Sequence, residues 1–565
     1  MYSSKKSVQQ LVGLLKAHEL KQIVLSPGSR NSPITCSLAN DPFFTCHTVV
    51  DERSAGFYAL GIAQHTGKGV AVCCTSGTAV LNYAPAVAEA YYQRLPLVVI
   101  TADRPAAWIE QMDGQTLPQP GVFNTLVKKS VQLPEIASEE DEWYANRLIN
   151  EALLAMTHRA CGPVHINVPL SEPLFEYETE QLPEVRKITR NQLPIVSEAV
   201  FLDYQKRFLK YKKTMVIAGQ SVDPGMTDAL NKLILMHDCV VLTEHISGIP
   251  PLYFFRNFDA TLGAIPEEKL ENYLPDLLIT VGGHIISKRI KQILRAHPPK
   301  EHWHLSPSGE IVDTYQCLTE VVEADAVEFI NYLSNHQRDP YIKKPFTLRW
   351  MYACVIPAPK VEFSDVMAVG ALMKALPKDA NLQLANSTSV RLAHLFRPLG
   401  QQRIYSNRGT SGIDGCLSTA LGQAAVSPNP TFLLIGDLAF FYDMNALWNQ
   451  QLSKNLRILL NNNGGGEIFH TLPGFKPSEA MEKYVVASHS WSARAWAEDR
   501  GFTYLSASDE QELTEQMPVF TAEGGDKPVL LEVFSSKEKN AEILQNYYNT
   551  LKQYMAENVN FTPRY

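Results

Sequence analysis

Short apolar segments recur along the whole chain, and each ends in a loop rich in small and polar residues. They alternate with stretches of helical periodicity, a pattern typical of parallel sheets covered by helices. The predicted strand segments fall into three groups: 22–28, 69–77, 95–105 and 162–170; 214–220, 238–247 and 275–284; 381–387, 431–437, 456–462 and 527–534. The predicted fold class is therefore α/β, with three doubly wound parallel-sheet domains.

The length of the chain sets the number of domains. At 565 residues it exceeds what one hydrophobic core supports, since cores stop growing beyond about 250–300 residues. Two charged stretches that contain prolines and lack periodicity, about 172–200 and 336–362, are predicted to be linkers. We therefore predict domains at 1–180, 190–340 and 360–565.

Composition excludes several classes of function. A net charge of −8 and a pI near 6.0, without a basic run, argue against a nucleic-acid partner. No apolar run approaches the roughly 20 residues that span a bilayer, and the N-terminal segment lacks the apolar core of a signal peptide. Nine scattered cysteines without a CxxC pair indicate reduced thiols, so we expect a cytoplasmic protein.

Two predicted strands in the last third end in complementary oxygen ligands. TFLLIG is followed by Asp437, and LRILL is followed by three asparagines and three glycines. Ligands of open α/β sheets bind beyond the carboxyl ends of the strands, so these side chains are expected to converge. A carboxylate and a carboxamide suit Mg²⁺, which binds few protein oxygens plus phosphates. The simpler interpretation is a helix cap and a turn.

The order and spacing of these residues resemble the diphosphate-anchoring motif of the thiamine-diphosphate enzymes, a Gly-Asp pair followed about two dozen residues later by a double asparagine. The resemblance implies thiamine diphosphate as the cofactor and domains of the thiamine-diphosphate enzyme type. It implies cofactor contacts from Gly436, Asp437, Leu438 and Ala439. Leu438 stands where the wider family has glycine, which marks a subgroup.

The resemblance also implies a bound Mg²⁺ or Mn²⁺. Aligned on the downstream Ile-Phe pair, its ligands are Asp437, Asn463 and the carbonyl of Gly465. Counted from Asp437 instead, they are Asn462 and Gly464. The run of asparagines and glycines is one residue longer than in the family, so both assignments stay open.

A second candidate site is Glu52, within the sequence DER after the apolar segment 43–50. Taken alone, an acidic group before a helix is a favourable helix start. In thiamine enzymes one carboxylate hydrogen-bonds N1′ of the aminopyrimidine and promotes loss of the C2 proton. The resemblance implies that Glu52 has this role, in a poorly hydrated pocket that raises its proton affinity. In the family the two halves of the cofactor are held by two subunits, so a homodimer is implied, and a tetramer stays open.

Arginine and lysine are concentrated in Ser/Gly-rich loops. The segments are SPGSRNSP, TADRP, ISKRIKQ, NSTSVR and YSNRGTSGIDG. A single exposed arginine is usually solvated surface, but arginine binds carboxylates bidentately and stays charged when desolvated. Together these loops predict a pocket for small molecules that carry several carboxylates.

Eight motifs occur in the order of one subgroup of the thiamine-diphosphate enzymes, over essentially the full length. They are SPGSR, DER, TSGTAV, TADRP, QPGVF, SNRGTSGIDG, GDL with YDMNAL, and NNNGGGEIF. The subgroup decarboxylates 2-oxoglutarate and adds the succinyl carbanion to isochorismate in a 1,4 sense, in menaquinone biosynthesis. The resemblance thus implies a transferase with these two substrates. The alternatives are another thiamine-dependent decarboxylase or carboligase, similar to acetohydroxyacid synthase, and a non-catalytic scaffold.

The resemblance extends to further site residues. Ile413 is implied to lie under the cofactor and enforce its bent shape. Residues implied to surround the cofactor and the succinyl chain are Ser29, Arg30, Ser387 and Arg391. Residues implied to receive substrate carboxylates are Arg104, Gln115, Lys288, Arg289 and Arg408. An apolar wall that excludes water is implied for Ile468 and Phe469.

Two histidines need separate interpretation. His165 lies in the predicted buried strand GPVHINVP and is expected to be a hydrogen-bonded core residue rather than a base. His470 follows the predicted apolar wall, but nothing in the sequence requires it for chemistry.

Overall fold

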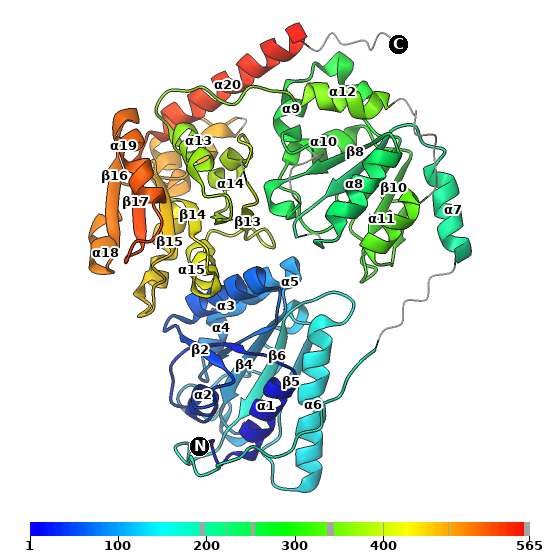
Figure 1. Cartoon of the computed structure of the whole chain (residues 1–565). Coiled ribbons are helices and arrows are strands. Elements are labelled where there is room, and N and C mark those ends of the chain that lie inside the picture. Colours follow the sequence, from blue (N-terminus) through cyan, green and yellow to red (C-terminus); the bar gives the residue numbers. More distant parts are fainter. Residues whose placement is uncertain are drawn as a thin grey trace.

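The computed structural model describes residues 1–191, 198–221, 223–249, 255–335, 344–398, 400–472 and 474–558. The predicted boundaries at 340 and 565, and parts of both predicted linkers, lie outside these residues. The described residues form three all-parallel sheets, each covered by helices (Figure 1). The fold class predicted from the sequence is confirmed.

The N-terminal domain, at the bottom of Figure 1, has a six-stranded sheet of order β2-β1-β3-β4-β6-β5. Its strands are β1 (Gln22–Leu25), β2 (Thr45–Thr48), β3 (Val70–Cys74), β4 (Leu97–Asp103), β5 (Lys129–Gln132) and β6 (Val164–Pro169). Its helices are α1 (Lys6–Ala17), α2 (Ser32–Ala39), α3 (Glu52–Thr66), α4 (Ala79–Asn82), α5 (Ala84–Gln93) and α6 (Glu139–Thr157), with short turns η1 (Ala106–Trp108) and η2 (Asn124–Leu126).

The middle domain has a five-stranded sheet of order β11-β10-β9-β7-β8. Its strands are β7 (Thr214–Ala218), β8 (Cys239–Thr243), β9 (Leu277–Val281), β10 (Glu301–Leu305) and β11 (Glu320–Val322). Its helices are α7 (Glu198–Phe208), α8 (Met226–Met236), α9 (Phe258–Ala264), α10 (Lys288–Ala296), α11 (Ala326–Ser334) and α12 (Pro345–Ala353), with η3 (His245–Ser247) and η4 (Glu267–Tyr273).

The C-terminal domain has a six-stranded sheet of order β13-β12-β14-β15-β17-β16. Its strands are β12 (Asn381–Leu384), β13 (Arg403–Ser406), β14 (Thr431–Gly436), β15 (Leu456–Asn462), β16 (Thr503–Ala507) and β17 (Val529–Phe534). Its helices are α13 (Asp365–Ala375), α14 (Thr388–Ala393), α15 (Cys416–Val426), α16 (Asp437–Tyr442), α17 (Glu479–Met481), α18 (Arg494–Asp499), α19 (Glu510–Thr521) and α20 (Lys537–Asn558). Shorter helical turns are η5 (Met444–Trp448), η6 (Glu467–Thr471) and η7 (Glu482–Val486).

The two outer sheets share one topology, because in each the second strand in sequence is at the edge and the first strand lies between it and the third. The middle sheet has the same arrangement in its first three strands. In such sheets the direction of winding reverses between the first and third strands, and ligands bind at that point. In the C-terminal domain the point lies between β12 and β14, where Ser387 and Asp437 follow the strand ends.

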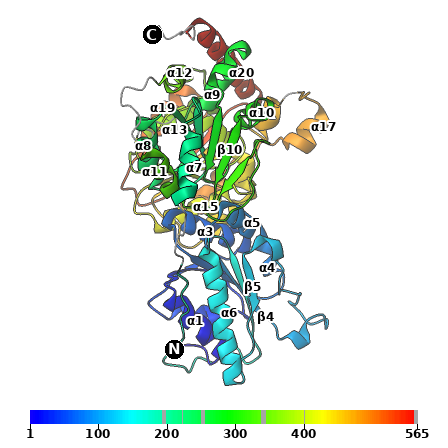
Figure 2. The ribbon, with the colours of Figure 1, turned by 90° about the vertical axis from the view of Figure 1, so that its right-hand side faces the viewer.

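The N-terminal and C-terminal domains pack through α3 and α15, which lie side by side (Figures 1 and 2). Glycines permit the close approach. A Cβ on Gly61 would lie 2.0 Å from the carbonyl oxygen of Thr419, and a Cβ on Gly422 would lie 2.0 Å from that of Tyr58. The two helices contribute to one buried apolar cluster, so these domains share a core.

The second stretch predicted to be a linker contains a helix, α12, and the prediction is wrong for its residues. Trp350 is fully buried, and its indole N–H donates to the carbonyl of Tyr273 at 3.2 Å. The Asp238 carboxylate accepts from the backbone N–H groups of Phe346 and Thr347, at 3.0 and 2.8 Å. A cap supplied from another element therefore starts this helix, and a sequence window cannot show it.

The longest of the described helices is α20, with 22 residues. It contacts α9 of the middle domain and η6 of its own domain, and runs along the top of the molecule in Figure 1. None of the described helices combines the length and apolarity that crossing a membrane requires.

Candidate active site

Asp437 lies at the junction of β14 and α16, with 2% of its surface exposed. The register pairs Gly436 with Asn461, so the ends of β14 and β15 are level. The carboxylate Oδ2 accepts from the backbone N–H groups of Gly464 and Gly465, at 2.8 and 2.9 Å. The acidic strand end and the asparagine–glycine loop therefore meet.

The asparagines of this loop have different environments. The Asn462 amide donates to the carbonyl of Trp491 and to Glu532, both at 2.7 Å. The Asn463 amide donates to Asp365 at 3.0 Å and to Glu467 at 2.6 Å. The Asn463 Oδ1 atom is buried and has no hydrogen-bond partner among the described residues. The Asn462 Oδ1 atom also accepts no hydrogen bond from the described residues, so both assignments of the ligand stay open.

The residues at this point fit a divalent cation bound to a diphosphate. A buried carboxylate and an amide oxygen without a partner are the hard oxygen ligands that Mg²⁺ and Mn²⁺ accept. A Cβ placed on Gly436 would meet no atom within 4 Å, so there is open space beside Asp437. Gly465 has a φ of +148°, a backbone conformation that residues with a Cβ atom rarely adopt.

Two buried carboxyl groups, which were not identified from the sequence, accept hydrogen bonds from the Asn463 amide. Asp365 is at the start of α13, and Glu467 is at the start of η6; each is at most 3% exposed. Burial raises the pKa of Asp365, and burial together with the Asp365 charge raises the pKa of Glu467 well above its usual value. The two groups hydrogen-bond to each other.

His489 is a further neighbour of Asp437 that no motif indicated. Its Nε2 atom lies 3.3 Å from Asp437 Oδ2, and its ring is stacked on Trp491 at 5.0 Å between centroids. Its Nδ1 atom accepts from the backbone N–H of Trp491 at 3.2 Å. The proton of a neutral His489 is therefore on Nε2, facing Asp437.

Glu52 is the first residue of α3 and is partly buried. Burial, and to a lesser extent the charge of Asp51, raise the pKa of its carboxyl. Within the described part of the chain, no other residue donates a hydrogen bond to this carboxylate. Its neighbours hold the helix start in place, because Asp51 accepts from Asn445 at 3.1 Å and Arg53 donates to the carbonyl of Tyr442 at 2.8 Å.

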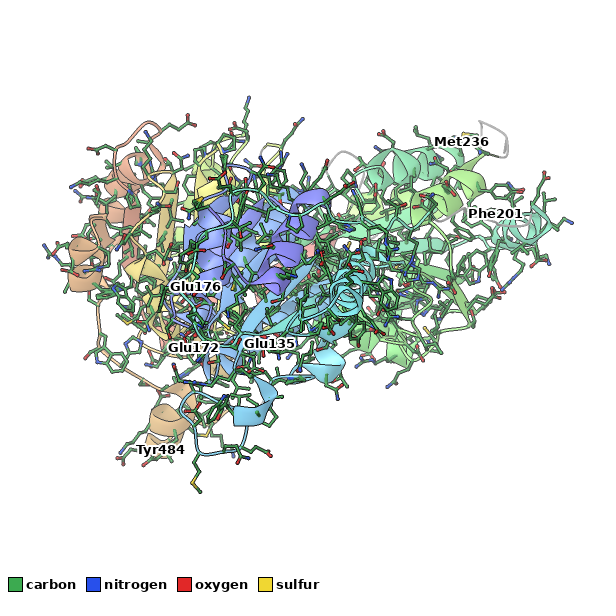
Figure 3. All side chains as sticks on the ribbon, turned by 90° about the horizontal axis from the view of Figure 1, so that it is seen from below. Glu135, Glu172, Glu176, Phe201, Met236 and Tyr484 are labelled. Carbon is green, nitrogen blue, oxygen red and sulfur yellow. The ribbon has the colours of Figure 1, made fainter. Side chains whose placement is uncertain are left out.

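One group of predicted substrate ligands lies in the N-terminal domain, at the ends of β1 and β4. Arg30 is 6% exposed, donates to the carbonyl of Leu170 at 2.8 Å and pairs with Glu172, which is labelled in Figure 3. Arg104 pairs with Asp113 at 2.9 Å. The backbone of Gln115 lies against Gly77, where a Cβ would be 3.1 Å from the Gln115 Cα. Ser29 is exposed beside this group.

A second group spans the middle and C-terminal domains. Arg289 pairs with Asp259 at 3.3 Å, and its guanidinium lies 5.3 Å from the ring centroid of Tyr548. Lys288, at the start of α10, is exposed. The backbone N–H groups of Ile286 and Ser287, just before α10, donate to the buried Glu244 at 2.7 and 2.8 Å. These bonds fix where α10 starts.

Arg391 and Arg408 complete the second group. Arg391 donates to the carbonyl of Ser387, and Arg408 donates to Asn386 at 2.7 Å. Ser387 has a φ of +69°, so the strand-to-helix turn before α14 is strained. Burial lowers the pKa of both guanidinium groups, and the charge of Arg391 lowers that of Arg408 further. Two cations held this close together favour an anionic ligand. The described contacts join no member of this group to the first group.

Comparisons with known proteins show which family this chain resembles. The family "Thiamine pyrophosphate enzyme, N-terminal TPP binding domain" matches residues 5–124, and "Middle domain of thiamine pyrophosphate" matches residues 182–384. The 2-succinyl-5-enolpyruvyl-6-hydroxy-3-cyclohexene-1-carboxylate synthase of Bacteroides thetaiotaomicron is 54% identical over 98% of this chain and 100% of its own length. The proteins of that name from Phocaeicola vulgatus and Flavobacterium psychrophilum are 51% and 40% identical, over 98% and 96% of this chain and 99% and 98% of their own lengths.

The chain belongs to the 2-succinyl-5-enolpyruvyl-6-hydroxy-3-cyclohexene-1-carboxylate synthase family. Ile413 is partly buried at the edge of the core that the outer domains share. Asn386, next to Ser387, donates to the carbonyls of Asn407 and Gly412, both at 2.6 Å. These bonds fix the loop that carries Ile413.

Ile468 and Phe469 lie in η6, one residue after the asparagine–glycine loop. Both are partly exposed. A Cβ on Gly466 would lie 2.8 Å from the ring of Phe469, so the ring packs over the loop backbone. This pair therefore presents apolar surface beside the residues around Asp437.

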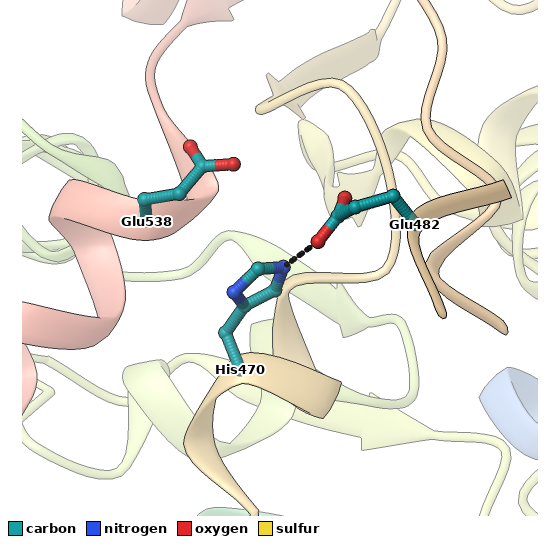
Figure 4. Close-up of side chains that lie close together, drawn as sticks. All are labelled: His470, Glu482 and Glu538. Carbon is teal, nitrogen blue, oxygen red and sulfur yellow. Dashed lines mark ion pairs between the residues drawn. The ribbon is translucent and has the colours of Figure 1, made fainter. Parts of the chain in front are cut away.

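His470, Glu482 and Glu538 have ligand atoms close enough to share a metal ion (Figure 4). His470 Nε2 lies 3.1 Å from Glu482. The Lys537 ammonium lies 3.8 Å from Glu482 and 3.3 Å from Glu538, so a positive charge is already present. We interpret the group as an ion-pair network that joins η6, η7 and α20.

His165 is a core residue, as predicted. It is fully buried and hydrogen-bonds the hydroxyl groups of Thr101 and Ser130, at 2.8 and 3.0 Å. Burial lowers its pKa to about 4, so the ring is neutral at pH 7.

Proposed function

We propose that this chain decarboxylates 2-oxoglutarate and adds the resulting succinyl unit to isochorismate in a 1,4 sense. The products are CO2 and 2-succinyl-5-enolpyruvyl-6-hydroxy-3-cyclohexene-1-carboxylate, in menaquinone biosynthesis. The observation that carries the proposal is the meeting of Asp437 with the asparagine–glycine loop, in a chain 54% identical to a synthase of that name. Two groups of cationic side chains can form charge-assisted hydrogen bonds with the several carboxylates of the substrates.

Thiamine diphosphate with Mg²⁺ or Mn²⁺ is the proposed cofactor. When bound, it supplies an electron sink for the pair released as CO2 leaves. Asp437, Asn463 Oδ1 and the Gly465 carbonyl would hold the cation. The backbone from Gly436 to Ala439 would lie against the diphosphate, and the open space beside Gly436 supports this.

Glu52 is proposed to hold a proton at its carboxyl, facing N1′ of the cofactor. Its raised pKa supports this role, because a partly buried carboxyl shares a proton more readily than a solvated one. The absence of a hydrogen bond from any other described residue leaves its oxygen atoms available for such a partner. Ile413 would support the cofactor ring.

The two cationic groups are proposed to divide the substrate carboxylates between them. 2-Oxoglutarate and isochorismate each carry two carboxylates, and each buried arginine contact contributes about 1.5–3 kcal/mol. The proposed ligands are Ser29, Arg30, Arg104, Gln115, Lys288, Arg289, Ser387, Arg391 and Arg408. Ile468 and Phe469 would exclude water from the reacting carbon.

A homodimer is proposed, because no contact between described residues joins the two cationic groups within one chain. Large apolar side chains in two segments also support it: Met112 is fully exposed, and Tyr484 and Trp491 are 75% and 64% exposed. Figure 2 shows α17, near Tyr484, projecting on the same side of the molecule as α4. We expect a second copy to cover these side chains. A tetramer built from such dimers, and a cytoplasmic location for the reduced thiols, are compatible with this proposal.

The test is an assay of CO2 release from 2-oxoglutarate and from pyruvate, each with and without isochorismate. The proposal predicts a strong preference for 2-oxoglutarate and a succinylated product, identified by mass spectrometry, only when isochorismate is present. Preference for pyruvate would instead support an enzyme similar to acetohydroxyacid synthase. It would overturn the proposed substrates while leaving the cofactor site intact.

A further inference from the structure

We infer that Glu89 of the N-terminal domain is a positioning residue for Arg408, a proposed substrate ligand of the C-terminal domain. The inference rests on the proposed function and adds a residue outside the proposed ligands. Glu89 lies on α5, at the upper edge of the N-terminal domain in Figure 1, and is 1% exposed. Arg408 lies in the loop between β13 and α15, which belongs to the other outer domain.

The carboxylate of Glu89 accepts four hydrogen bonds. Its Oε1 atom accepts from the backbone N–H of Gly409 at 2.7 Å and from the Gln93 amide. Its Oε2 atom accepts from the backbone N–H and the hydroxyl of Thr410, both at 2.6 Å. Three of the four donors belong to the two residues that directly follow Arg408, so this acid fixes the loop backbone beside the arginine.

The loop also lies directly against the backbone of α5. A Cβ on Gly409 would lie 2.6 Å from the carbonyl oxygen of Glu89, a spacing that glycine alone permits. The middle domain reaches the same place, because the Gln220 amide after β7 donates to Gln93 at 3.0 Å and to the carbonyl of Ser406 at 2.8 Å. Groups from both other domains therefore hold the start of this loop.

The guanidinium of Arg408 has few partners of its own. Among the described residues it makes one hydrogen bond, from Nη1 to Asn386 Oδ1 at 2.7 Å, and its buried Nε atom has no partner. Burial and the charge of Arg391 lower the pKa of Arg408, whereas the charges of Glu244 and Glu89 act in the opposite direction. Donors remain for an anionic ligand, and their direction depends on where the loop places the backbone of Arg408.

The alternative is that Glu89 serves only to dock one domain on another. Gln64 on α3 lies at the same boundary and is a matched comparison, since it donates to Gln93 at 2.8 Å and accepts from Gln423 of α15 at 2.9 Å. Within the described part of the chain, none of its hydrogen bonds reaches residues 407–412. A docking role alone would make the two residues equivalent, whereas a positioning role ties Glu89 to Arg408.

The experiment is a double-mutant cycle in the full-length protein with thiamine diphosphate and Mg²⁺, in which steady-state kinetics are measured with each substrate varied in turn. Arg408→Ala should raise the KM of the substrate whose carboxylate it binds. Glu89→Ala should raise the same KM about 10–100-fold, with kcat within about threefold of the original. In the Arg408→Ala protein, Glu89→Ala should change that KM by less than about twofold, because the arginine that it positions is gone.

A second pair of variants covers the case in which Glu89→Ala does not fold. Thr410→Val has nearly the same shape as the native residue and removes only the hydroxyl that donates to Glu89, so the same KM should rise about threefold or more. Thr410→Ser keeps the hydroxyl and should restore the original KM. Gln64→Ala is the control, expected to melt at a lower temperature with unchanged KM values.

The outcomes separate the inference from the proposed function. Effects of Glu89→Ala and Arg408→Ala on KM that multiply independently, or an equal rise in Gln64→Ala, would overturn the inference and leave the proposed function intact. Lack of turnover of 2-oxoglutarate and isochorismate by the unsubstituted protein would overturn the proposed function, and this inference with it.

Discussion

At the scale of single residues, the neighbouring Asn462 and Asn463 have different proposed roles. Asn462 holds the buried Glu532, whereas Asn463 presents an oxygen without a partner. We expect Asn463→Ala to weaken Mg²⁺-dependent cofactor binding at least about tenfold, which is about 1.4 kcal/mol. Asn462→Ala should leave binding unchanged and lower the free energy of unfolding by about 1–3 kcal/mol, because Glu532 loses a donor. Binding titrations and denaturant unfolding of both variants separate the two roles; the reverse pattern would make Asn462 the ligand.

A substitution at Glu52 is expected to separate cofactor binding from turnover. Glu52→Gln keeps the size of the side chain but cannot hold a proton at a carboxyl oxygen. We expect cofactor binding close to that of the original protein and a kcat lower by about 10²–10⁴-fold. Steady-state assays at saturating cofactor measure this. Turnover at the original rate would remove Glu52 from the chemistry.

The buried carboxyl group of Asp443 predicts how the stability of the protein changes with pH. It is fully buried, accepts from the N–H and the hydroxyl of Ser418, both at 2.7 Å, and burial raises its pKa to about 7 from an ordinary 3.8. Between these two values the folded state keeps a proton that the unfolded state has released, so stability falls as pH rises. We expect the melting temperature to fall more between pH 5 and pH 8 than it does in Asp443→Asn. Parallel curves for the two proteins would contradict this assignment.

At the scale of elements, the crossing of α3 and α15 decides how the outer domains dock. Gly61→Ala would normally stabilise a helix by about 1 kcal/mol. Here the new methyl group would lie 2.0 Å from a backbone carbonyl, which cannot move aside without separating the helices. We expect a loss of more than about 3 kcal/mol in the free energy of unfolding.

Gly114→Ala is the control for this crossing, because a Cβ there meets no atom within 4 Å. Thermal and denaturant unfolding should show little change for the control. A Gly61→Ala protein as stable as the control would mean that the crossing tolerates wider spacing than the contacts imply.

The interior strands could be predicted from the sequence because their apolar runs are continuous, as in β14 and β15. The strand β10 was not predicted, since His302 and His304 break its apolar pattern. Both histidines hydrogen-bond to one hydroxyl, that of Thr280 on β9, at 2.9 Å each. Only the tertiary structure supplies that partner.

The sequence indicates some residues of the candidate site and gives no signal for others. Residues that follow strands, such as Asp437 and Arg391, can be found because strand ends mark where ligands bind. Asp365, Glu467 and His489 could not, because they lie far apart in sequence and match no motif. Their roles follow from three-dimensional contacts alone.

At the scale of the whole molecule, no contact between described residues joins Glu52 to Asp437 or Asn463 within one chain. If two copies complete the site, Glu52 of one copy acts with Asp437 and Asn463 of the other. Mixed dimers of Glu52→Gln and Asn463→Ala would then contain one intact site. Co-expression should restore about a quarter of the original activity, since half of the dimers are mixed and each has one working site. Activity no higher than that of the two separate variants would place the site within one chain.

The central claim is that the Asp437 loop binds thiamine diphosphate through a divalent cation. Isothermal titration calorimetry with thiamine diphosphate tests it most directly, in Mg²⁺ and again after chelation of the metal. The account predicts saturable binding in Mg²⁺ that is lost with the chelator and regained when Mg²⁺ is restored. Absence of binding in ample Mg²⁺, or equal binding in the chelator, would contradict it.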